Sequence, residues 1–341
     1  MGKFYVHYNL WQFMPIDKNI AYLGSYYPHH AFNDLKEIVE GGFTSITFCV
    51  NELDWWRYRD VAKNTIKVAH DLQLKVFVDM HGFGQFAGPH SYFLAEHPEC
   101  CQIDNQGNRA WNRGCPSNSS YVAWLTNTAQ EIIRYLEPDG MFWDEPHFAQ
   151  SPRWPEIWCC CCENCKVEYR RYYRSDLPRH LTPEVSEFRE RSAYRLLESL
   201  FDAAQAVDPK VENQLCLMPD LTGIHGFRSW EPVKDFKNLR TFATDPYWAW
   251  SGKKFEWFLD WSERCVDFAH KNGMLAQIWV ALIKVPRGRE REIIVPTIIE
   301  AAKLGADSVA TWSYRGGPGS IYACEDPESS WKALIEAYRK I

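Results

Sequence analysis

The stretch that decides the fold is DGMFWDEPHF, at residues 139–148. Its first half is a short apolar run, typical of a strand that is buried on both faces of a parallel sheet. The run ends in two adjacent carboxylates, Asp144 and Glu145, which are followed by a proline. A charge directly after a buried strand must be hydrated, paired or used, so we expect this strand to open onto a polar site.

Apolar runs of this kind alternate with longer amphipathic segments along the whole chain. We predict strands at residues 3–9, 44–50, 75–80, 140–144, 212–218, 240–244, 275–280 and 308–312. Helical patterns lie between or after them at residues 31–39, 60–72, 119–136, 183–206, 254–272, 290–304 and 328–340. No glycine-rich nucleotide-binding motif follows the first strand, and no internal repeat interrupts the alternation. The sequence therefore predicts the α/β class, as a single (β/α)8 TIM barrel over residues 1–341 with long loops after the third and fourth strands.

The composition of the chain argues against some classes of binding partner. The formal net charge of −6 gives no electrostatic footprint for a polyanion, so we expect no binding to nucleic acid. The first ten residues lack the pattern of a signal peptide, and no apolar run reaches the roughly 18 residues of a membrane-spanning helix. We therefore expect a soluble, cytoplasmic protein without a membrane partner. The 16 Trp and 17 Tyr residues fit contact with the apolar faces of sugars as well as an aromatic core.

A further strand-end carboxylate, Asp245, follows the apolar run at residues 240–244 and precedes a proline. Because the C-terminal ends of barrel strands meet at one face, Asp245 should lie near Asp144 and Glu145. Cleavage of a glycosidic bond requires one carboxyl group to protonate the leaving oxygen and a second to attack the anomeric carbon or activate water. These residues can supply that pair, although strand-end carboxylates also stabilise turns and loops.

Other polar and aromatic residues near the strand ends are candidates for the wall of a substrate pocket. The polar candidates are Glu52, His81, His147 and Gln277, and the aromatic candidates are Trp11, Trp143, Trp248, Trp279 and Trp312. Aromatic faces stack on sugars, and a few polar groups among them would orient hydroxyl groups. We therefore expect a carbohydrate ligand, in the form of a small oligosaccharide or glycoside.

The roles of the carboxylates depend on which strands carry them. One arrangement, resembling that of many α-glycosidases, places the nucleophile after the fourth barrel strand and the acid/base after the sixth, whereas another places the nucleophile at the seventh. The predicted seventh strand, residues 275–280, contains no carboxylate. We therefore expect a retaining enzyme with Asp144 as nucleophile and Asp245 as acid/base, and with Glu145 as the substitute for either role.

Five of the 12 cysteines lie between Cys159 and Cys165, in a chain that lacks the features of a small disulfide-rich secreted domain. Within this cluster, the spacing Cys160-x-Cys162-x2-Cys165 brings three thiolates close enough to bind one zinc ion. Cys115, in the loop after the third strand, is the best candidate for the fourth ligand, because neighbouring loops meet at the barrel face. Four thiolates would make the zinc structural, and a set of reduced thiols without metal is the alternative.

This region of the chain resembles family 42 β-galactosidases and related barrel-fold glycosyl hydrolases. The similarity rests on Cys115, on the cysteine spacing at 160–165, on HPE at 97–99 and on the DG that precedes Asp144 and Glu145. It implies glycosidase activity, a zinc site that includes Cys115, and Glu145 at the position of the family's acid. The chain departs from the family in carrying Asp144 where the family has Asn, and in a seventh-strand region that holds Gln277 and no glutamate. The resemblance and the surplus of aromatic residues also make a homo-oligomer possible.

Two other functions remain open at this point. His81 and His147 could join Asp144 and Asp245 as ligands of a catalytic metal, which would make the protein a metal-dependent barrel hydrolase or isomerase. The other alternative is a barrel that binds carbohydrate without cleaving it. Loss of activity on substitution of Asp144 or Asp245 would distinguish an enzyme from such a binding protein.

Overall fold

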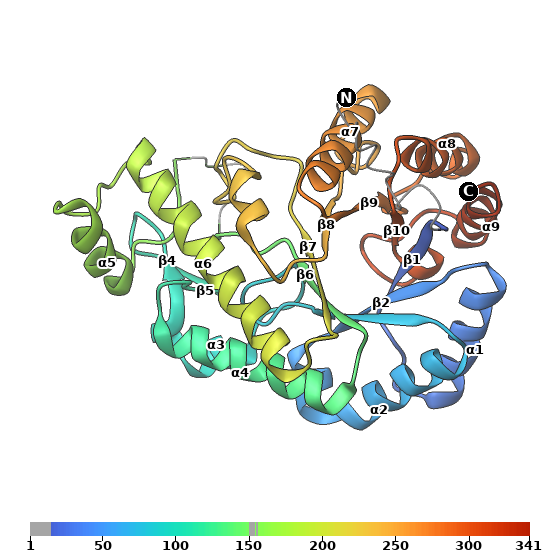
Figure 1. Ribbon diagram of the computed structural model, residues 1–341, viewed down its shortest axis with the longest axis horizontal. Coiled ribbons are helices and arrows are strands. Elements are labelled where there is room, and N and C mark those ends of the chain that lie inside the picture. Colours follow the sequence, from blue (N-terminus) through green and yellow to red (C-terminus); the bar gives the residue numbers. More distant parts are fainter. Residues whose placement is uncertain (1–14, 150–153, 155) are drawn as a thin grey trace, which may run out of the picture.

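The computed structural model describes residues 15–149, 154 and 156–341. Eight parallel strands form a closed barrel in the order β1-β10-β9-β8-β7-β6-β3-β2 (Figure 1). The barrel strands are β1 (Asp17–Tyr22), β2 (Ser45–Val50), β3 (Lys75–Met80), β6 (Gly140–Asp144), β7 (Glu212–Cys216), β8 (Thr241–Thr244), β9 (Leu275–Ala281) and β10 (Ser308–Trp312). Two further strands, β4 (Cys101–Ile103) and β5 (Arg109–Gly114), pair with each other in an antiparallel hairpin. The (β/α)8 fold predicted from the sequence is therefore confirmed.

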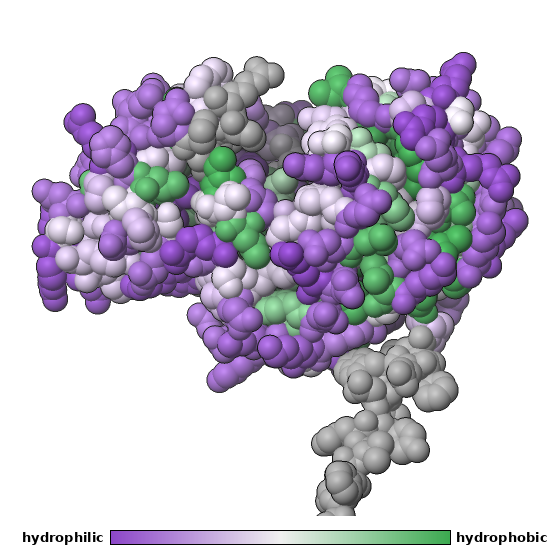
Figure 2. Space-filling model, turned by 90° about the horizontal axis from the view of Figure 1, so that it is seen from above, coloured by the Kyte–Doolittle hydropathy of each residue, from purple (hydrophilic) through white to green (hydrophobic). Residues whose placement is uncertain are grey.

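Helices lie between the strands in the sequence, and most of them cover the outside of the barrel (Figure 1). They are α1 (Pro28–Glu40), α2 (Glu52–Asp71), α3 (Tyr92–Glu96), α4 (Ser119–Leu136), α5 (Glu163–Tyr173), α6 (Pro183–Val207), α7 (Phe255–Lys271), α8 (Glu290–Lys303) and α9 (Pro327–Tyr338), with the short 3-10 turns η2 (Pro98–Cys100), η3 (Glu231–Asp235) and η4 (Tyr314–Gly316). Buried positions recur with helical spacing, as in α1, which buries Ala31, Leu35 and Ile38. Figure 2 shows a face of the molecule on which hydrophilic residues predominate and hydrophobic residues gather in separate patches. Among the described helices, none is long and apolar enough to cross a membrane.

Seven of the predicted strands match barrel strands closely, and the prediction for the first strand differs. The first barrel strand is β1, whereas residues 3–9, predicted as the first strand, lie outside the described residues. The sequence of β1, DKNIAY, reads as polar because its first half carries groups that bond at the bottom of the barrel. Asp17 accepts hydrogen bonds from Thr44 Oγ1 at 2.7 Å, Ser45 Oγ at 2.9 Å and Ser308 Oγ at 2.8 Å. Because of this partly buried polar network, β1 lacks the apolar run that identifies the other strands.

The helix α2 begins earlier than the predicted helix at residues 60–72. Asn51 caps it by accepting hydrogen bonds from the backbone amides of Leu53 at 2.9 Å and Asp54 at 3.0 Å, and the Asp54 side chain accepts from the Asn51 amide in return. This reciprocal capping box starts the helix where the apolar spacing is still irregular. The first turn of α2 consequently packs near the C-terminal ends of the strands.

The inside of the barrel is filled by side chains in layers. One layer contains the buried residues Ala21, Phe77, Phe142, Cys216, Ala243, Trp279 and Ala310. Gly140 makes room for this layer, because a Cβ atom there would lie 2.6 Å from Cδ1 of Phe77. The large rings of Phe142 and Trp279, 5.0 Å apart, close the barrel below the ends of the strands. The barrel is therefore a packed core with a floor, and the space above that floor is available for a site.

Two long loops extend the barrel on one side. The loop after β3 contains α3, the β4–β5 hairpin and the turn into α4, and the loop after β6 leads to α5. Asp104 and Cys159 form an isolated antiparallel bridge between the two loops. In Figure 1 the hairpin and α5 lie together at the left of the barrel. The positions of the two loops agree with the prediction of long loops after the third and fourth barrel strands.

Candidate active site

A cavity of about 630 Å³ opens at the C-terminal ends of the strands. Its lining includes the three carboxylates singled out from the sequence, Asp144, Glu145 and Asp245. It also includes the aromatic residues Tyr247, Trp250, Trp257, Trp312 and Tyr322, together with His81 and Met218. The volume falls within the range of roughly 300–1,000 Å³ that is usual for small-molecule sites. The structure thus brings the three carboxylates together in one cavity that can hold a small ligand.

Asp144 reaches the cavity because it lies two residues after Phe142 on β6, and alternate residues of a strand face the same side. Glu145 would face the opposite side if the strand continued. Its φ angle of 44° instead turns the chain into the left-handed region, and its amide donates a hydrogen bond to the carbonyl of Cys216 at 3.2 Å. This local turn brings the Glu145 side chain back to the cavity beside Asp144.

Asp245 lies two residues after the inward-facing Ala243 and therefore also points inward. Its carboxyl group shares a hydrogen bond with that of Glu145. Burial, followed by the charge of Glu145, raises the pKa of Asp245 well above its ordinary value. Burial also raises the pKa of Glu145, although its hydrogen bond with Asp245 and the charge of Arg113 oppose the rise. Burial therefore favours the protonated form of both groups, and their hydrogen bond favours the proton on Asp245 over Glu145.

Burial raises the pKa of Asp144 well above its ordinary value, and the charges of Glu145 and Asp79 raise it further. Arg113, in β5, acts in the opposite direction on the pKa of both Asp144 and Glu145. Arg113 is not predicted from the sequence, because it lies in an irregular hairpin inside the loop after β3. Arg113 lies close to Cys115 in the sequence, and Cys115 is predicted to lie near the barrel face. This proximity is the feature of the sequence that indicates a position for Arg113 near the site.

His81 follows β3 and lines the cavity, and its ring centroid lies 5.7 Å from that of Trp312. Its Nδ1 atom is 3.3 Å from Oδ2 of Asp79, which is fully buried. His81 and Trp312 are thus the two predicted pocket-wall residues that line the cavity. The cavity is also lined by four aromatic residues that were not predicted from the sequence, Tyr247, Trp250, Trp257 and Tyr322.

Several predicted pocket-wall residues lie elsewhere. Trp143 faces outward, because it neighbours the inward-facing Asp144 in the strand, and its indole donates to Oδ1 of Asn213 at 2.9 Å. The indole of Trp248 donates to Oγ1 of Thr297 at 3.1 Å, on the far side of the loop that carries Tyr247. The prediction that Trp143 and Trp248 wall the pocket is therefore wrong for this structure.

Gln277 and Trp279 face the barrel interior but lie below the cavity. The Trp279 indole donates to Oε1 of Gln277 at 2.8 Å, and Nε2 of Gln277 donates to Oγ of Ser308 at 3.1 Å. Both side chains are buried and neither is part of the cavity lining. They form the floor of the site, so their predicted contact with substrate is not supported. Trp11 lies outside the described residues.

Glu52 and His147 also lie away from the cavity lining. Glu52, in the first turn of α2, accepts a hydrogen bond from the amide of Phe93 at 2.9 Å and so holds the loop after β3. Nδ1 of His147 is 4.0 Å from Oε2 of Glu145, and the His147 ring lies 4.7 Å from that of His225. Burial lowers the pKa of His147, and His225 and Arg113 lower it further. His147 is therefore a neutral side chain that lies next to Glu145 and outside the cavity lining.

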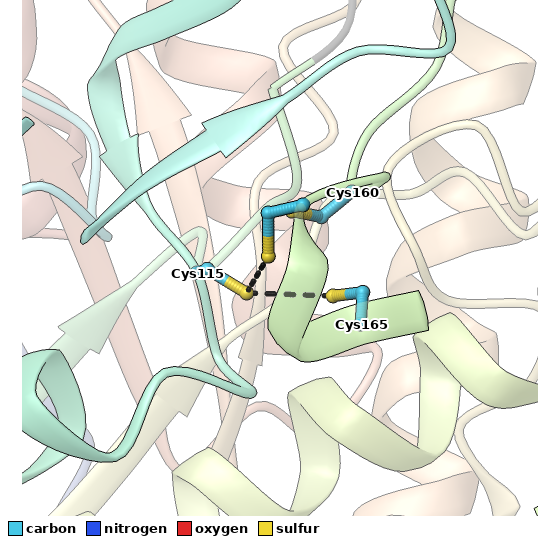
Figure 3. A group of neighbouring side chains, drawn as sticks. Cys115, Cys160 and Cys165 are labelled. Atoms are coloured by element: carbon cyan, nitrogen blue, oxygen red, sulfur yellow. Dashed lines mark hydrogen bonds between the residues drawn. The ribbon is translucent and has the colours of Figure 1, made fainter. Parts of the chain in front are cut away.

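The predicted cysteine ligands converge at one point. Sγ of Cys115 lies 3.4 Å from Sγ of Cys165 and 3.4 Å from Sγ of Cys162, and all four sulfur atoms, including that of Cys160, lie within 4.8 Å of one another. Figure 3 shows Cys115 and Cys165 approaching from the loop after β5 and from the first turn of α5. Zinc–sulfur bonds of about 2.3 Å in a tetrahedron place sulfur atoms about 3.8 Å apart. The four buried thiols therefore fit a zinc ion.

Arg189 of α6 fixes the loop that carries this cluster. Its guanidinium is buried and donates to the carbonyl of Cys159 at 2.6 Å. The same group donates to the carbonyls of Gly223 at 2.8 Å and Ile224 at 3.0 Å, in the loop after β7. One side chain thus joins the loops that follow β6 and β7.

Side chains that could hold a metal form two groups in the described part of the chain. One is the four-cysteine cluster, and the other consists of Cys49, Asp79 and His81. The catalytic metal set considered from the sequence, His81 and His147 with Asp144 and Asp245, is not among them. The metal-dependent hydrolase that would use this set is therefore not supported.

The fold resembles that of solved glycoside hydrolases. A β-galactosidase from the Antarctic haloarchaeon Halorubrum lacusprofundi matches with a TM-score of 0.76 and 13% sequence identity, over 95% of this chain and 58% of that chain. A catalytic mutant of a GH42 β-galactosidase from G. stearothermophilus matches with a TM-score of 0.71 and 12% identity, over 95% of this chain and 56% of that chain. The catalytic domain of β-amylase from Paenibacillus polymyxa matches with a TM-score of 0.66 and 9% identity, over 94% of this chain and 98% of that chain.

The chain spans little more than half the length of the two β-galactosidases. No protein-family model matches the sequence, and no curated protein matches it either. At these low identities the similarity concerns the fold alone: the chain is a (β/α)8 barrel, the fold that these solved glycoside hydrolases also have.

Proposed function

We propose that the protein is a glycoside hydrolase that cleaves a small oligosaccharide or glycoside. The observation that carries this proposal is the presence of Asp144, Glu145 and Asp245 in one cavity at the C-terminal ends of β6 and β8. Paired carboxyl groups at this end of a barrel are the machinery of glycosidic cleavage. The structural similarity to β-galactosidases and a β-amylase supports the proposal.

The contact between Glu145 and Asp245 guides the assignment of roles. Acid and nucleophile must flank the scissile bond, with their carboxyl groups about 5–5.5 Å apart in a retaining enzyme and farther apart in an inverting one. Two carboxyl groups that share a hydrogen bond are too close to flank a bond in this way. Glu145 and Asp245 therefore act as one unit, and Asp144 supplies the second group.

In the proposed reaction Asp245 is the acid/base, because burial and Glu145 favour its protonated form. Asp245 gives its proton to the leaving oxygen, and Glu145, hydrogen-bonded to Asp245, holds the carboxyl group in place. Asp144 attacks the anomeric carbon in its ionised form; burial and the charge of Glu145 raise its pKa and oppose this form, and the charge of Arg113 favours it. The glycosyl–Asp144 ester is then hydrolysed by water, which Asp245 deprotonates, so the configuration is retained.

The cavity favours a short substrate. Its floor is closed by the rings of Phe142 and Trp279, so a sugar chain cannot pass through the barrel. Trp250 and Tyr322 are about half exposed and line the cavity, where their faces are available for stacking on the substrate. A substrate of one or a few sugar units, bound by its end, suits a site of this kind.

We further propose that Cys115, Cys160, Cys162 and Cys165 bind a structural zinc ion. The four thiols are buried and converge, and none of them lines the cavity. Four thiolates leave no coordination position for a reactant, so the bound ion would join the loops after β3 and β6 and take no part in the reaction.

Activity assays with nitrophenyl glycosides of both anomers test the proposed function. The wild-type protein should release nitrophenol from a subset of them, and NMR of the freshly formed sugar should show the anomer of the substrate. Asp144→Asn should abolish turnover while ligand binding is kept. Glu52→Gln is the matched control, because it removes a strand-end carboxylate that does not line the cavity. Turnover by Asp144→Asn at the wild-type rate would contradict the assignment.

A further inference from the structure

Three chemically different side chains meet at the edge of the cavity. Cys49 is the fifth residue of β2, and it lies directly opposite Asp79 in the parallel register with β3. His81 follows two residues after Asp79 and so extends from the same face of the strand. One ligand atom from each of the three residues lies within 4.8 Å of the other two.

The polar atoms of this group lack the hydrogen bonds that buried atoms normally make. Asp79 is fully buried, and neither of its carboxylate oxygens has a partner of good hydrogen-bond geometry among the described residues, although the Cys49 thiol is close enough to interact with this carboxylate. Nδ1 of His81 lacks one as well, although it is only 3.3 Å from Oδ2 of Asp79. Burial of a carboxylate without a strong partner is unfavourable, so these atoms require another explanation.

We propose that Cys49, Asp79 and His81 bind a zinc ion at the edge of the cavity, at a site separate from the four-cysteine cluster. Bonds of about 2.0–2.1 Å from a tetrahedral zinc ion place its nitrogen and oxygen ligands about 3.3 Å apart. In the structure Nδ1 of His81 and Oδ2 of Asp79 are 3.3 Å apart, which fits two ligands of one ion. The combination of thiolate, imidazole and carboxylate favours zinc over magnesium or calcium, which prefer oxygen ligands.

The electrostatic surroundings also favour a cation. The charge of Asp79 acts on Asp144, which in turn lies beside Glu145, so three acidic groups are close to one another. Arg113 is the cation that acts on Asp144 and Glu145, and its single charge does not balance this group. A divalent ion on Asp79 would reduce the excess negative charge at the base of the cavity.

The coordination of this site differs from that of the four-cysteine cluster. Three protein ligands leave one position of a tetrahedral ion for water or another oxygen ligand, as in zinc sites that are accessible to small molecules. His81 lines the cavity, so the ion would lie between the barrel core and the space where a ligand binds. The proposal concerns metal binding and holds independently of the proposed glycosidase activity.

Cadmium NMR of the full-length wild-type protein tests the proposal without relying on a variant. Cadmium replaces zinc, and its resonance position reports how many sulfur ligands surround it. We expect a signal for an ion with one sulfur ligand and nitrogen and oxygen ligands, in addition to any signal from a four-sulfur site. A spectrum without the mixed-ligand signal would overturn the proposal, whatever the four-cysteine cluster binds.

The zinc content of variants, measured after dialysis, gives the second test. Cys49→Ala and Asp79→Asn should each lose one equivalent of zinc relative to the wild type. Cys216→Ala is the matched control, since it removes another buried thiol from the barrel interior and should keep the wild-type zinc content. If Asp79→Asn folds and retains the full zinc content, Asp79 serves only to orient His81 and the proposal fails.

Discussion

Asp144 and Glu145 are consecutive in the chain, yet both line the same cavity, because Glu145 has a φ angle of 44°. In a regular strand the two carboxylates would point to opposite faces, and one of them would enter the layer between barrel and helices. A left-handed conformation at a residue other than glycine is unfavourable and is maintained here by hydrogen bonds of the flanking backbone. The paired carboxylates therefore depend on a backbone turn as much as on the identity of the residues.

The acid role of Asp245 predicts a dependence on the leaving group. Asp245→Asn should lower kcat for glycosides with poor leaving groups by about 10²–10⁴-fold, because their oxygen must be protonated as the bond breaks. Nitrophenyl glycosides should lose much less, since nitrophenolate leaves without a proton. Parallel assays of alkyl and nitrophenyl glycosides measure this difference. An equal loss for both substrate types would exclude Asp245 as the acid.

The raised pKa values predict an active range displaced toward higher pH. Asp144 must be ionised to attack, and burial raises its pKa, so kcat/KM should begin to rise with pH only above the ordinary range of an aspartate. Asp245 must be protonated to act as the acid. Its raised pKa keeps it protonated at pH values above the ordinary pKa of an aspartate. The expected profile is bell-shaped, with both limbs above the ordinary aspartate pKa.

Substitution of Arg113 tests whether the charges around Asp144 set the pH range of activity. Arg113 lowers the pKa of Asp144, so Arg113→Gln should move the acidic limb of the profile to still higher pH. Arg109→Gln, in the same hairpin, is the control and should leave the limb in place. A profile of Arg113→Gln that matches the wild type would show that the guanidinium does not act on the nucleophile.

The same buried carboxyl groups should lower stability near neutral pH. The pKa of Asp245 is higher in the folded protein than in the unfolded chain, so the folded state gains from the protonated form and this gain is lost as pH rises through the folded pKa. Asp245→Asn should therefore raise the free energy of unfolding near neutral pH, by about 0.5–2 kcal/mol. Below the ordinary aspartate pKa the difference should vanish. Urea unfolding at both pH values measures it, and a variant that is less stable near neutral pH would contradict the prediction.

The four-cysteine site predicts that zinc and stability change together. Cys165→Ser should lose one equivalent of zinc, and its free energy of unfolding should fall by at least about 2.7 kcal/mol when free zinc is roughly 100-fold above the dissociation constant of the wild type. Thermal unfolding with and without added zinc measures this difference. Cys265→Ala, which changes a buried thiol far from the cluster in the sequence, should keep the zinc content. Zinc-independent stability of the wild type would refute a structural zinc.

The aromatic wall of the cavity can be tested by two tryptophans of similar exposure. Trp250, 49% exposed, lines the cavity, whereas Trp111, 51% exposed, lies in the β4–β5 hairpin. Trp250→Ala should raise KM by roughly two- to tenfold, which corresponds to a stacking contribution of about 0.5–1.5 kcal/mol. Trp111→Ala should leave KM unchanged. Equal effects of the two substitutions would argue against stacking at Trp250.

The barrel could be predicted because its strands are apolar and its helices amphipathic. The runs at β3, β6 and β10 agree with the predicted bounds, since their side chains are almost all buried. β1 was not predicted because Asp17 accepts hydrogen bonds at the bottom of the barrel from Ser45 and Ser308, which lie in other strands and are remote in the sequence. These hydrogen-bond partners come together only in the closed barrel, so the sequence around β1 does not indicate them.

The carboxylates of the site could be predicted from the sequence, because each of them lies at the end of a buried apolar strand or directly after it. The two-residue period of a strand places Trp143 on the opposite face from Asp144, so the sequence itself argues against Trp143 in the pocket wall. No strand or helix pattern of the sequence indicates that Arg113 approaches the carboxylates or that Glu145 adopts a left-handed conformation. Both depend on the path of loops, which local sequence patterns do not determine.

The guanidinium of Arg189 has a consequence for how such a protein can be altered. It holds carbonyl groups of the loops after β6 and β7 at the same time, so an insertion in one loop displaces the anchor of the other. A chimera that exchanges one of these loops alone would lose the shared anchor, whereas a graft that carries both loops together with α6 would keep it. For recombination, in nature or in the laboratory, these segments form a single exchangeable unit.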